Sequence, residues 1–358
     1  MLRQKTMRTG IKLSFVVLVT LLLSPLPADG QKKLNVVTTL PTYAAIAREV
    51  AGDLAEVKAI ARGDEDPHFV NPRPSFAATV QRADLFVATG LDLELWVPTI
   101  LDRANNSKVD VGGPGNIVAY AGITLLEVPD SPSRAGGDVH VFGNPHIHTD
   151  PINGIIIAQN IVAGLKRVDP DNGPTYEANL EDFEQRVLER LFGEQLIELL
   201  GAETILPLAR NYQLWGFLES QTYDGKPLTA YLGGWLAQAE SFRDSRMVCY
   251  HRNWAYLSAR FKIDCAMYIE PKPGIPPSPG HVRQVIDFIE AENIAILFAA
   301  NYFSHSQVER VASRANVKAL IVPEHVAGAQ GIDDYISLVD LWISRLAAAY
   351  AERRPGHP

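Results

Sequence analysis

The sequence predicts an α/β protein with two lobes, each built on a parallel β-sheet, and a long helix that joins them. In both halves of the chain, short runs rich in β-branched residues alternate with amphipathic helical stretches. This alternation is typical of βαβ units, whose strands form parallel sheets. A helical stretch without strands separates the two halves. The chain is also long enough for two domains.

The individual elements follow from these runs. The first half alternates strand-like and helical stretches, at 34–40, 42–52, 55–61, 75–83 and 84–90. The second half carries four strand-like runs, at 246–250, 265–270, 294–300 and 317–323. Between the halves, residues 174–200 follow a turn-forming Asp-Pro-Asp-Asn-Gly segment and carry apolar residues at helical spacing, interrupted only by Gly193. Residues 201–234 fit no regular element and are interpreted as a cap or an insertion in a lobe.

The first thirty residues predict an export signal. Four basic residues precede an apolar run at 13–23, and the small residues Ala28 and Gly30 suggest cleavage after Gly30. The run is only eleven residues long, whereas a membrane-spanning helix needs about 20. No cysteine follows it, so we expect a freely soluble periplasmic protein without a lipid anchor.

These boundaries divide the chain into five expected parts. They are a signal peptide, an N-terminal lobe, a linking helix, a C-terminal lobe and a tail, at residues 1–30, 31–170, 171–203, 204–352 and 353–358.

The charge balance argues against nucleic acid as a partner. After cleavage, 29 Lys and Arg residues remain against 40 Asp and Glu residues, a net charge of −11, and phosphate binding needs a basic face. The two cysteines, Cys249 and Cys265, are too few for a disulfide scaffold. They could pair in an oxidising compartment, and buried unreactive thiols are an equal alternative.

Histidines in loops of the first half suggest metal binding. His68 lies in an acidic, proline-rich loop after the second strand, and three more histidines, His140, His146 and His148, lie within nine residues. Imidazole nitrogen is the commonest ligand for zinc. His146 and His148 share a face of an extended segment, but their rings would have to bend around one ion, so we expect only one of them to bind.

The second half adds candidates at the ends of two strands. His251 follows the strand at 246–250, and Glu324 and His325 follow the strand at 317–323. Open α/β sheets bind ligands at the carboxyl ends of their strands. Each residue alone is equally explained as a loop or packing residue, but their convergence predicts a metal site. The sequence has no HExxH motif, no paired CxxC motif, no Gly-rich phosphate loop and no GxSxG elbow.

Four segments in order resemble the solute-binding proteins that serve zinc and manganese ABC importers, known as cluster A-I. They are DPHFVNPRPS, GNPHIHTDP, YHRNWAYLSARF and EPKPGIPPSP, and the resemblance covers residues 34–350. It implies two α/β lobes joined by a long rigid helix, with the metal in the cleft between them. It also implies metal binding without catalysis, delivery to an ABC importer permease in the inner membrane, and a monomer.

The resemblance also implies the ligands. The family's three histidines match His68, His146 and His251, while His148 stands where tryptophan is frequent. The family's fourth ligand is a carboxylate in a Leu-Asp-Pro-like turn. This chain has Val-Pro-Glu-His-Val at 322–326, so Glu324 is expected in that position, with His325 or water as alternatives.

The expected ligands favour zinc. Three imidazoles and a carboxylate suit zinc better than manganese, which is the alternative cargo. Imidazoles must be neutral to bind, so affinity is expected to fall as the pH drops through about 6.5.

Two other functions are compatible with the same fold. A periplasmic zinc-dependent hydrolase would need an open zinc position and a general base such as Glu65 or Glu324. A protein that binds a metal chelate would use aromatic side chains, among them Trp96, Trp215, Trp235 and Trp254.

Overall fold

The computed structural model describes residues 32–130, 140–270, 272 and 274–352. The chain divides into Met1–Lys32 and Lys33–Pro358, and all helices and strands described below belong to the second unit. The expected signal peptide and tail lie outside the described residues. Within the described part of the chain, no helix is long and apolar enough to cross a membrane.

The N-terminal lobe contains a four-stranded parallel sheet in the order β2-β1-β3-β4. Its strands are β1 Leu34–Thr38, β2 Ala55–Ala59, β3 Leu85–Ala88 and β4 Asn116–Val118. Its helices are α1 Pro41–Ala51, α2 Pro74–Val80 and α3 Val97–Ala104. The three expected strands are confirmed. Sequence reasoning missed β4, because three residues are too few to show a periodic pattern.

The C-terminal lobe contains a second parallel sheet, in the order β10-β9-β7-β8. Its strands are β7 Arg246–Cys249, β8 Asp264–Tyr268, β9 Ile296–Ala300 and β10 Lys318–Val322. Its helices are α10 Ala255–Phe261, α11 Pro279–Ala291, α12 His305–Arg314 and α13 Tyr335–Ala351. A disulfide joins Cys249 on β7 to Cys265 on β8, so of the two alternatives for the cysteines the structure has the paired one.

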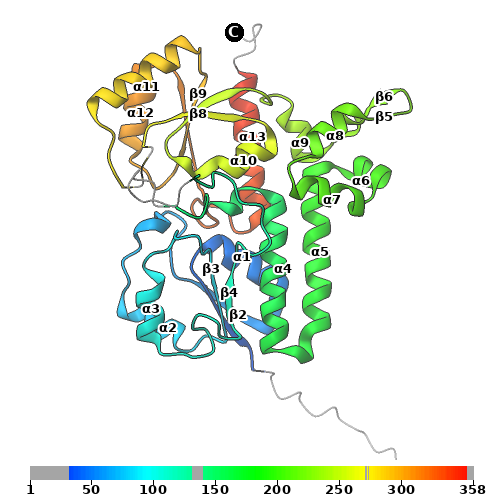
Figure 1. Cartoon of the computed structure of the whole chain (residues 1–358), viewed down its shortest axis with the longest axis vertical. Helices are drawn as coiled ribbons and strands as arrows, with labels where there is room; N and C mark the ends of the chain where they lie inside the picture. Colours follow the sequence, from blue (N-terminus) through cyan, green and yellow to red (C-terminus); the bar gives the residue numbers. More distant parts are fainter. Residues whose placement is uncertain (1–31, 131–139, 271, 273, 353–358) are drawn as a thin grey trace, which may run out of the picture. The chain divides into compact units, whose positions relative to one another are not determined.

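Two long helices, α4 Pro151–Val168 and α5 Gly173–Phe192, pack against each other, and α5 links the two lobes (Figure 1). The helix α5 ends at Gly193, where the backbone has φ 78°. A Cβ at Gly193 would lie 2.5 Å from Cα of Gly233, so only glycine fits this close approach of two segments. The expected helical stretch at 174–200 is therefore two helices, α5 and α6 Glu194–Leu200.

A group of short elements follows α5 (Figure 1). It comprises α6, α7 Ala202–Arg210, α8 Leu214–Ser220, β5 Thr222–Tyr223, β6 Lys226–Pro227 and α9 Gly234–Ala239. The two strands form an antiparallel hairpin with exposed residues. Leu214, Trp215 and Leu218 on α8 are buried, so this segment packs on the lobe while its hairpin extends into solvent.

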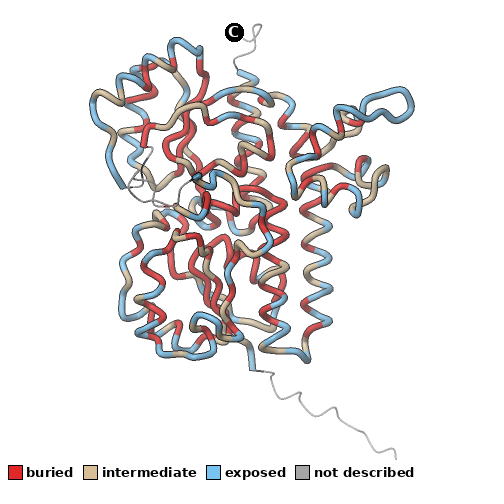
Figure 2. The backbone as a smooth tube through the Cα atoms, viewed as in Figure 1, coloured by how far each residue is buried: buried red, intermediate tan, exposed pale blue. Residues whose placement is uncertain are grey.

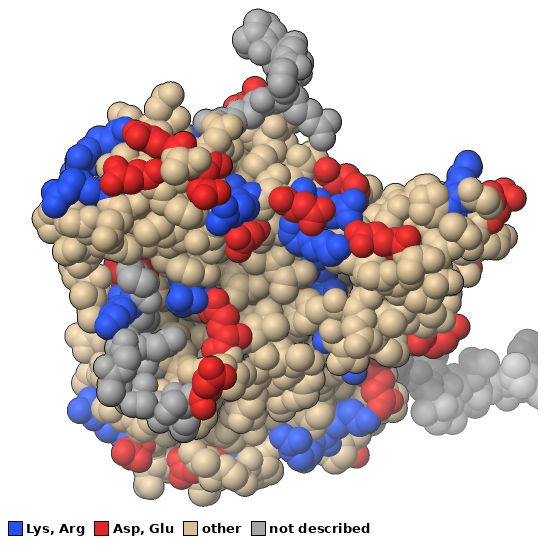
Figure 3. Space-filling model, turned by 45° about the horizontal axis from the view of Figure 1, so that its top comes forward, with Lys and Arg blue, Asp and Glu red and all other residues tan. Residues whose placement is uncertain are grey.

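Burial concentrates in the sheets and in α4 (Figure 2). In α4 the first eight residues, from Pro151 to Ala158, are all buried, because this helix packs against α1, α5 and strands of the N-terminal sheet. Charged side chains lie at the surface, and on the face shown in Figure 3 both signs are intermixed. Many of these charges are paired, as Arg243 is with Glu240 at 3.0 Å.

Buried polar contacts hold the two lobes together. Arg260 on α10 donates to both carboxylate oxygens of Asp150, each at 2.8 Å, and both side chains are almost fully buried. The same carboxylate accepts from the backbone N–H of Ile152 and so caps α4. The hydroxyl of Tyr335 on α13 donates to the carbonyls of His148 and Asp150, at 2.8 and 3.0 Å. These bonds fix the segment that leads into α4.

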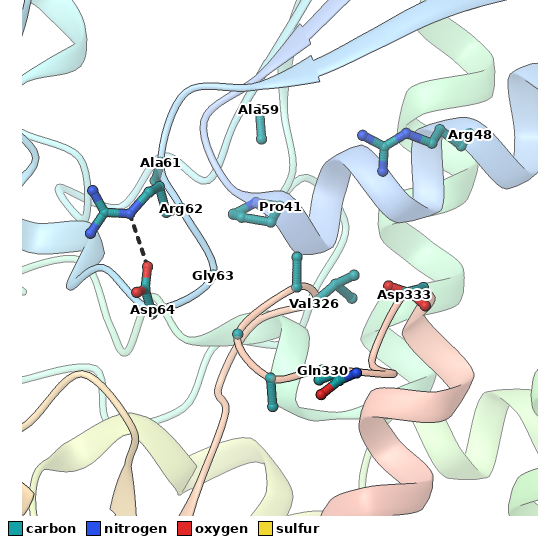
Figure 4. A pocket seen from close by; sticks show the side chains of 13 residues that line it. Pro41, Arg48, Ala59, Ala61, Arg62, Gly63, Asp64, Val326, Gln330 and Asp333 are labelled. Carbon is teal, nitrogen blue, oxygen red and sulfur yellow. Dashed lines mark hydrogen bonds and ion pairs between the residues drawn. The ribbon is translucent and has the colours of Figure 1, made fainter.

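The loops after β2 and β10 approach each other at Gly63 and Gly328. A Cβ on Gly63 would lie 2.3 Å from the backbone nitrogen of Gly328, so the two main chains are in direct contact. A cavity of about 800 Å³ lies between these loops. Its polar lining comes from Arg48, Asp64, Gln330 and Asp333, together with Arg62, which pairs with Asp64 at 3.0 Å (Figure 4).

Candidate metal centre

Three of the expected histidines come from separate places in the fold. His68 lies in a single 3-10 turn, η2 Pro67–Phe69, which Asp66 caps by accepting from the backbone N–H of His68. His146 immediately precedes another such turn, η4 Ile147–Thr149. His251 follows β7 at the carboxyl end of the second sheet. Two residues thus come from the first half of the chain and one from the second.

The structure brings His68, His146 and His251 together. One ring nitrogen of each lies within 4.8 Å of the others. The ring centroid of His68 lies 5.3 Å from that of His146 and 5.8 Å from that of His251. The side chains of His146 and His251 are buried, and that of His68 is 6 % exposed. These three rings are called the outer group below.

Each ring of the outer group is held by a hydrogen bond at Nδ1. The acceptors are Oδ1 of Asp66 for His68 at 2.6 Å, Oε1 of Glu324 for His146 at 2.8 Å, and the carbonyl of Glu270 for His251 at 2.7 Å. This arrangement makes Nδ1 the donor and leaves Nε2 as the basic nitrogen. Carboxylates and carbonyls orient metal-binding histidines in this way and fix their tautomer.

The Nε2 atoms of His146 and His251 are buried and have no hydrogen-bond partner among the described residues. Two buried acceptors without partners are rare in folded proteins and call for an explanation such as an absent ion. A zinc ion would satisfy them, because tetrahedral zinc with Zn–N bonds of about 2.0–2.1 Å needs ligand nitrogens about 3.3 Å apart. The outer group therefore fits a transition-metal ion in its ligand type and orientation.

His140 is a fourth imidazole at the outer group. Its Nε2 lies 3.1 Å from Nε2 of His68, and its ring centroid lies 6.1 Å from that of His146. The side chain is 6 % exposed. Sequence reasoning noted His140 in the cluster of three histidines but did not select it as a ligand. The unusual density of histidines between 140 and 148 was the signal that pointed to it.

Glu324 and His325 lie elsewhere. The structure does not bring them to the Nε2 atoms of the outer group. They form a second set of mutually close side chains with His148, called the inner group below. Oε1 of Glu324 contacts Nδ1 of His146, the nitrogen on the opposite side of that ring from Nε2. A carboxylate in this position orients His146 and does not reach an ion at Nε2.

Burial favours the neutral form of His140, His146 and His251. Loss of solvent lowers the pKa of His251 to about 4 and that of His140 to about 2, and it lowers the pKa of His146 well below its ordinary value. The neighbouring histidines add to each shift, because a second positive charge in the cluster is unfavourable. Burial opposes ionisation of Asp66, but the hydrogen bonds and charge of His68 lower the pKa of this carboxyl. Neutral rings with an ionised acceptor are the forms that a metal site needs.

Two parallel-sheet lobes that contribute buried imidazoles to one group define a periplasmic metal-binding protein of ABC metal uptake. The particular family follows from the sequence. The chain belongs to the family described as zinc-uptake complex component A, periplasmic, whose sequence model matches residues 36–191 and 228–349. Residues 192–227, which include α6 to β6, fall outside the match.

Individual relatives differ in the metal that their names carry. The chain is 25 % identical to the iron-binding protein YfeA of Yersinia pestis, over 98 % of this chain and 97 % of that protein. It is also 25 % identical to the zinc-binding lipoprotein AdcA of Streptococcus pneumoniae, over 81 % of this chain and 49 % of that protein. The manganese ABC transporter substrate-binding lipoprotein PsaA of Streptococcus mitis is 27 % identical, over 49 % of this chain and 55 % of that protein. The chain thus matches about half the length of the two lipoproteins.

Solved structures confirm the fold. A crystal structure of ZnuA superposes with a TM-score of 0.63 at 22 % identity and covers 89 % of this chain and 100 % of that one. A periplasmic metal-binding protein of Candidatus Liberibacter asiaticus superposes with a TM-score of 0.59 at 21 % identity, over 89 % of this chain and 100 % of that one. The predicted architecture of two parallel-sheet lobes with a linking helix is therefore confirmed.

The word lipoprotein in several of these names is at odds with the expectation that this chain lacks a lipid anchor. The segment on which that expectation rested lies outside the described residues.

Proposed function

We propose that this protein captures a zinc ion in the periplasm with the outer group, His68, His146 and His251, and delivers it to the permease of an ABC importer in the inner membrane. The observation that carries the proposal is the convergence of three imidazoles whose Nδ1 atoms are all bonded to acceptors. Rings held in this way present Nε2 to one point.

His140 is the candidate for the fourth ligand in this proposal. Its Nε2 lies 3.1 Å from Nε2 of His68, but it is not among the three residues whose ring nitrogens lie within 4.8 Å of one another, so its ring would have to move closer to bind the same ion. Glu324, which the sequence favoured for this position, instead orients His146 through Nδ1. His325 belongs to the inner group. A ligand set of four imidazoles and no carboxylate is richer in nitrogen than the set expected from the sequence.

The ligand chemistry favours zinc as the cargo. Imidazole suits zinc, copper, iron and nickel, whereas manganese prefers carboxylate, carbonyl and water oxygens. Two carboxylates beside these rings, those of Asp66 and Glu324, are engaged by histidine nitrogens. Four protein ligands complete a tetrahedral zinc ion and leave no open position for a reactive water, which a hydrolase would need.

The test is a competition titration of the metal-free protein with zinc and with manganese, each against a chelator of known affinity. We expect zinc to bind more tightly than manganese in the parent. We expect zinc affinity to fall at least 100-fold in His68→Ala, His146→Ala and His251→Ala. The matched control is His305→Ala, at an exposed position on α12. Equal zinc affinity in the parent and in all three variants would exclude the outer group, and tighter binding of manganese would overturn the choice of cargo.

A further inference from the structure

The inner group consists of His148, Glu324 and His325, three fully buried side chains. One potential ligand atom of each lies within 4.8 Å of the other two. The rings of His148 and His325 stack, with centroids 4.6 Å apart and an interplanar angle of 26°. They come from the turn before α4 and from the loop after β10, so the fold brings together two distant parts of the chain.

The inner group contains polar atoms without partners. Among the described residues, Nε2 of His148 and Nε2 of His325 make no hydrogen bond. Nε2 of His148 lies 3.6 Å from Oε1 of Glu324, which is too long for a hydrogen bond. Buried polar nitrogens are normally satisfied, and those that are not point to an absent water or ion.

Two further atoms of the inner group are held by hydrogen bonds, whereas Nδ1 of His148 also has no partner among the described residues. Oε2 of Glu324 accepts from Asn253 at 2.8 Å and from the hydroxyl of Tyr302. Nδ1 of His325 lies 3.1 Å from the hydroxyl of Thr42. These contacts leave Oε1 of Glu324 and Nε2 of each histidine directed to the same small region.

Charge also argues for a cation. Glu324 is fully buried, and within the described part of the chain no lysine or arginine lies within 4.0 Å of its carboxylate. A buried carboxyl group without a lysine or arginine beside it can take a metal ion as its cationic partner. A divalent ion between the carboxylate and the two imidazoles would balance the charge and satisfy both nitrogens.

We propose that the inner group is a second metal centre, which binds a divalent transition-metal ion, zinc, through Nε2 of His148, Nε2 of His325 and Oε1 of Glu324. The two centres share Glu324, which is a ligand of the inner ion and the hydrogen-bond acceptor of His146 in the outer group. An ion in the inner centre withdraws electron density from this carboxylate and weakens its support of His146. Binding of one ion therefore weakens binding of the other.

The cavity between the loops after β2 and β10 lies close to the inner group. Its lining residues Pro41 and Val326 lie close together in Figure 4 and are the chain neighbours of Thr42 and His325. The backbone N–H of Val326 donates to the hydroxyl of Thr42 at 3.3 Å. The inner group thus lies next to one wall of this cavity.

Metal counting tests the proposal. The metal-free protein is loaded with excess zinc chloride, unbound ion is removed, and zinc per chain is measured by mass spectrometry. We expect two zinc ions in the parent, one in His148→Phe, one in His325→Gln, and one in His251→Ala, which disables the outer centre only. We expect none in the combined variant His148→Phe/His251→Ala. One ion in the parent and none in His251→Ala would overturn the inner centre, as would two ions in both His148→Phe and His325→Gln.

Two further measurements guard against a variant that does not fold and separate the two proposals. Circular dichroism shows which variants keep the fold, and His251→Ala tests the inner centre without changing it. Anomalous scattering at the zinc edge then locates the ions in crystals of the parent. A peak about 2.0–2.2 Å from Nε2 of His148 and of His325 supports the inner centre. If no peak lies there, the inner centre is refuted. If the peak there is the only one, the inner centre is upheld and the proposed outer site is refuted.

Discussion

Oε1 of Glu324 lies 2.8 Å from Nδ1 of His146, so one carboxylate holds a ring of the outer group while it belongs to the inner group. The two residues come from opposite halves of the chain. The hydrogen bond therefore depends on the lobes being correctly assembled. It also makes the orientation of one ligand in the outer group sensitive to what happens at the inner group.

Hydrogen bonds to Nδ1 should tune zinc affinity without supplying ligands. We predict that Asp66→Asn, which removes the charge of the acceptor for His68, lowers zinc affinity by about 10–100-fold. The measurement is a competition titration with a chelator. The matched control is Asp64→Asn, two residues away, where an exposed carboxylate pairs with Arg62. Equal losses in both variants would show that general electrostatics, and not the orientation of His68, is responsible.

The ring of His251 should stay neutral in mildly acidic conditions. Burial lowers the pKa of His251 to about 4, so this ring stays neutral well below the pH of about 6.5 that an exposed histidine implies. We predict that protons compete with zinc for His251 only below about pH 5. An NMR titration of the His251 ring in the metal-free protein tests this, and a midpoint near pH 6.5 would contradict it.

The same shift affects stability in a defined direction. The pKa of His251 is lower in the folded than in the unfolded chain, so between about 6.5 and 4 the unfolded chain binds more protons. The metal-free protein should therefore be most stable above about pH 6.5 and lose stability as the pH falls towards 4. Urea unfolding at a series of pH values measures this, and stability that rises on acidification through this window would be inconsistent with the shift.

The buried pair of Arg260 and Asp150 should be essential for stability. We predict that Arg260→Met destabilises the metal-free protein by about 3–5 kcal/mol, because it leaves the carboxylate of Asp150 buried without its partner. Lys318→Met is the control, since Lys318 pairs with Glu352 at the surface, and its loss should cost less than about 1 kcal/mol. Urea unfolding of both variants checks the difference. Similar small losses in both would mean that Asp150 is reached by water or rearranges.

The disulfide between Cys249 and Cys265 should also stabilise the fold. It closes a sequence separation of 16 residues, for which the loss of chain entropy in the unfolded state corresponds to about 3 kcal/mol. We predict that Cys249→Ser/Cys265→Ser lowers the free energy of unfolding by about this amount and leaves zinc stoichiometry unchanged. Detection of two free thiols in the denatured, unreduced parent would refute the pairing.

Local patterns were sufficient to predict most of the fold. The run at 317–323 is apolar and β-branched, and it forms β10 as expected. The helix after the first lobe was predicted too long, because the apolar spacing continues past Gly193, whereas the backbone there must meet Gly233. That contact joins residues forty positions apart, and no local pattern reports it.

The candidate site was also predicted in part from local sequence and in part left undecided by it. His68 and His251 were predicted from their places after strands, and the structure brings them to one point with His146. The partition of Glu324 and His325 into a separate group could not be predicted. This partition arises because the loop after β10 contacts the Nδ1 side of the His146 ring and not the Nε2 side. Packing between the lobes decides which side is contacted. The position of His140 also depends on tertiary contacts.

The contact between Gly63 and Gly328 determines how closely the two lobes approach each other at this edge. Because a Cβ on either glycine would collide with the main chain of the other loop, the spacing of the two loops is set by peptide groups alone. Any side chain at position 63 would act as a wedge and push the lobes apart at this edge. Graded substitutions there, from alanine to valine, would widen this edge of the molecule stepwise without replacing any histidine.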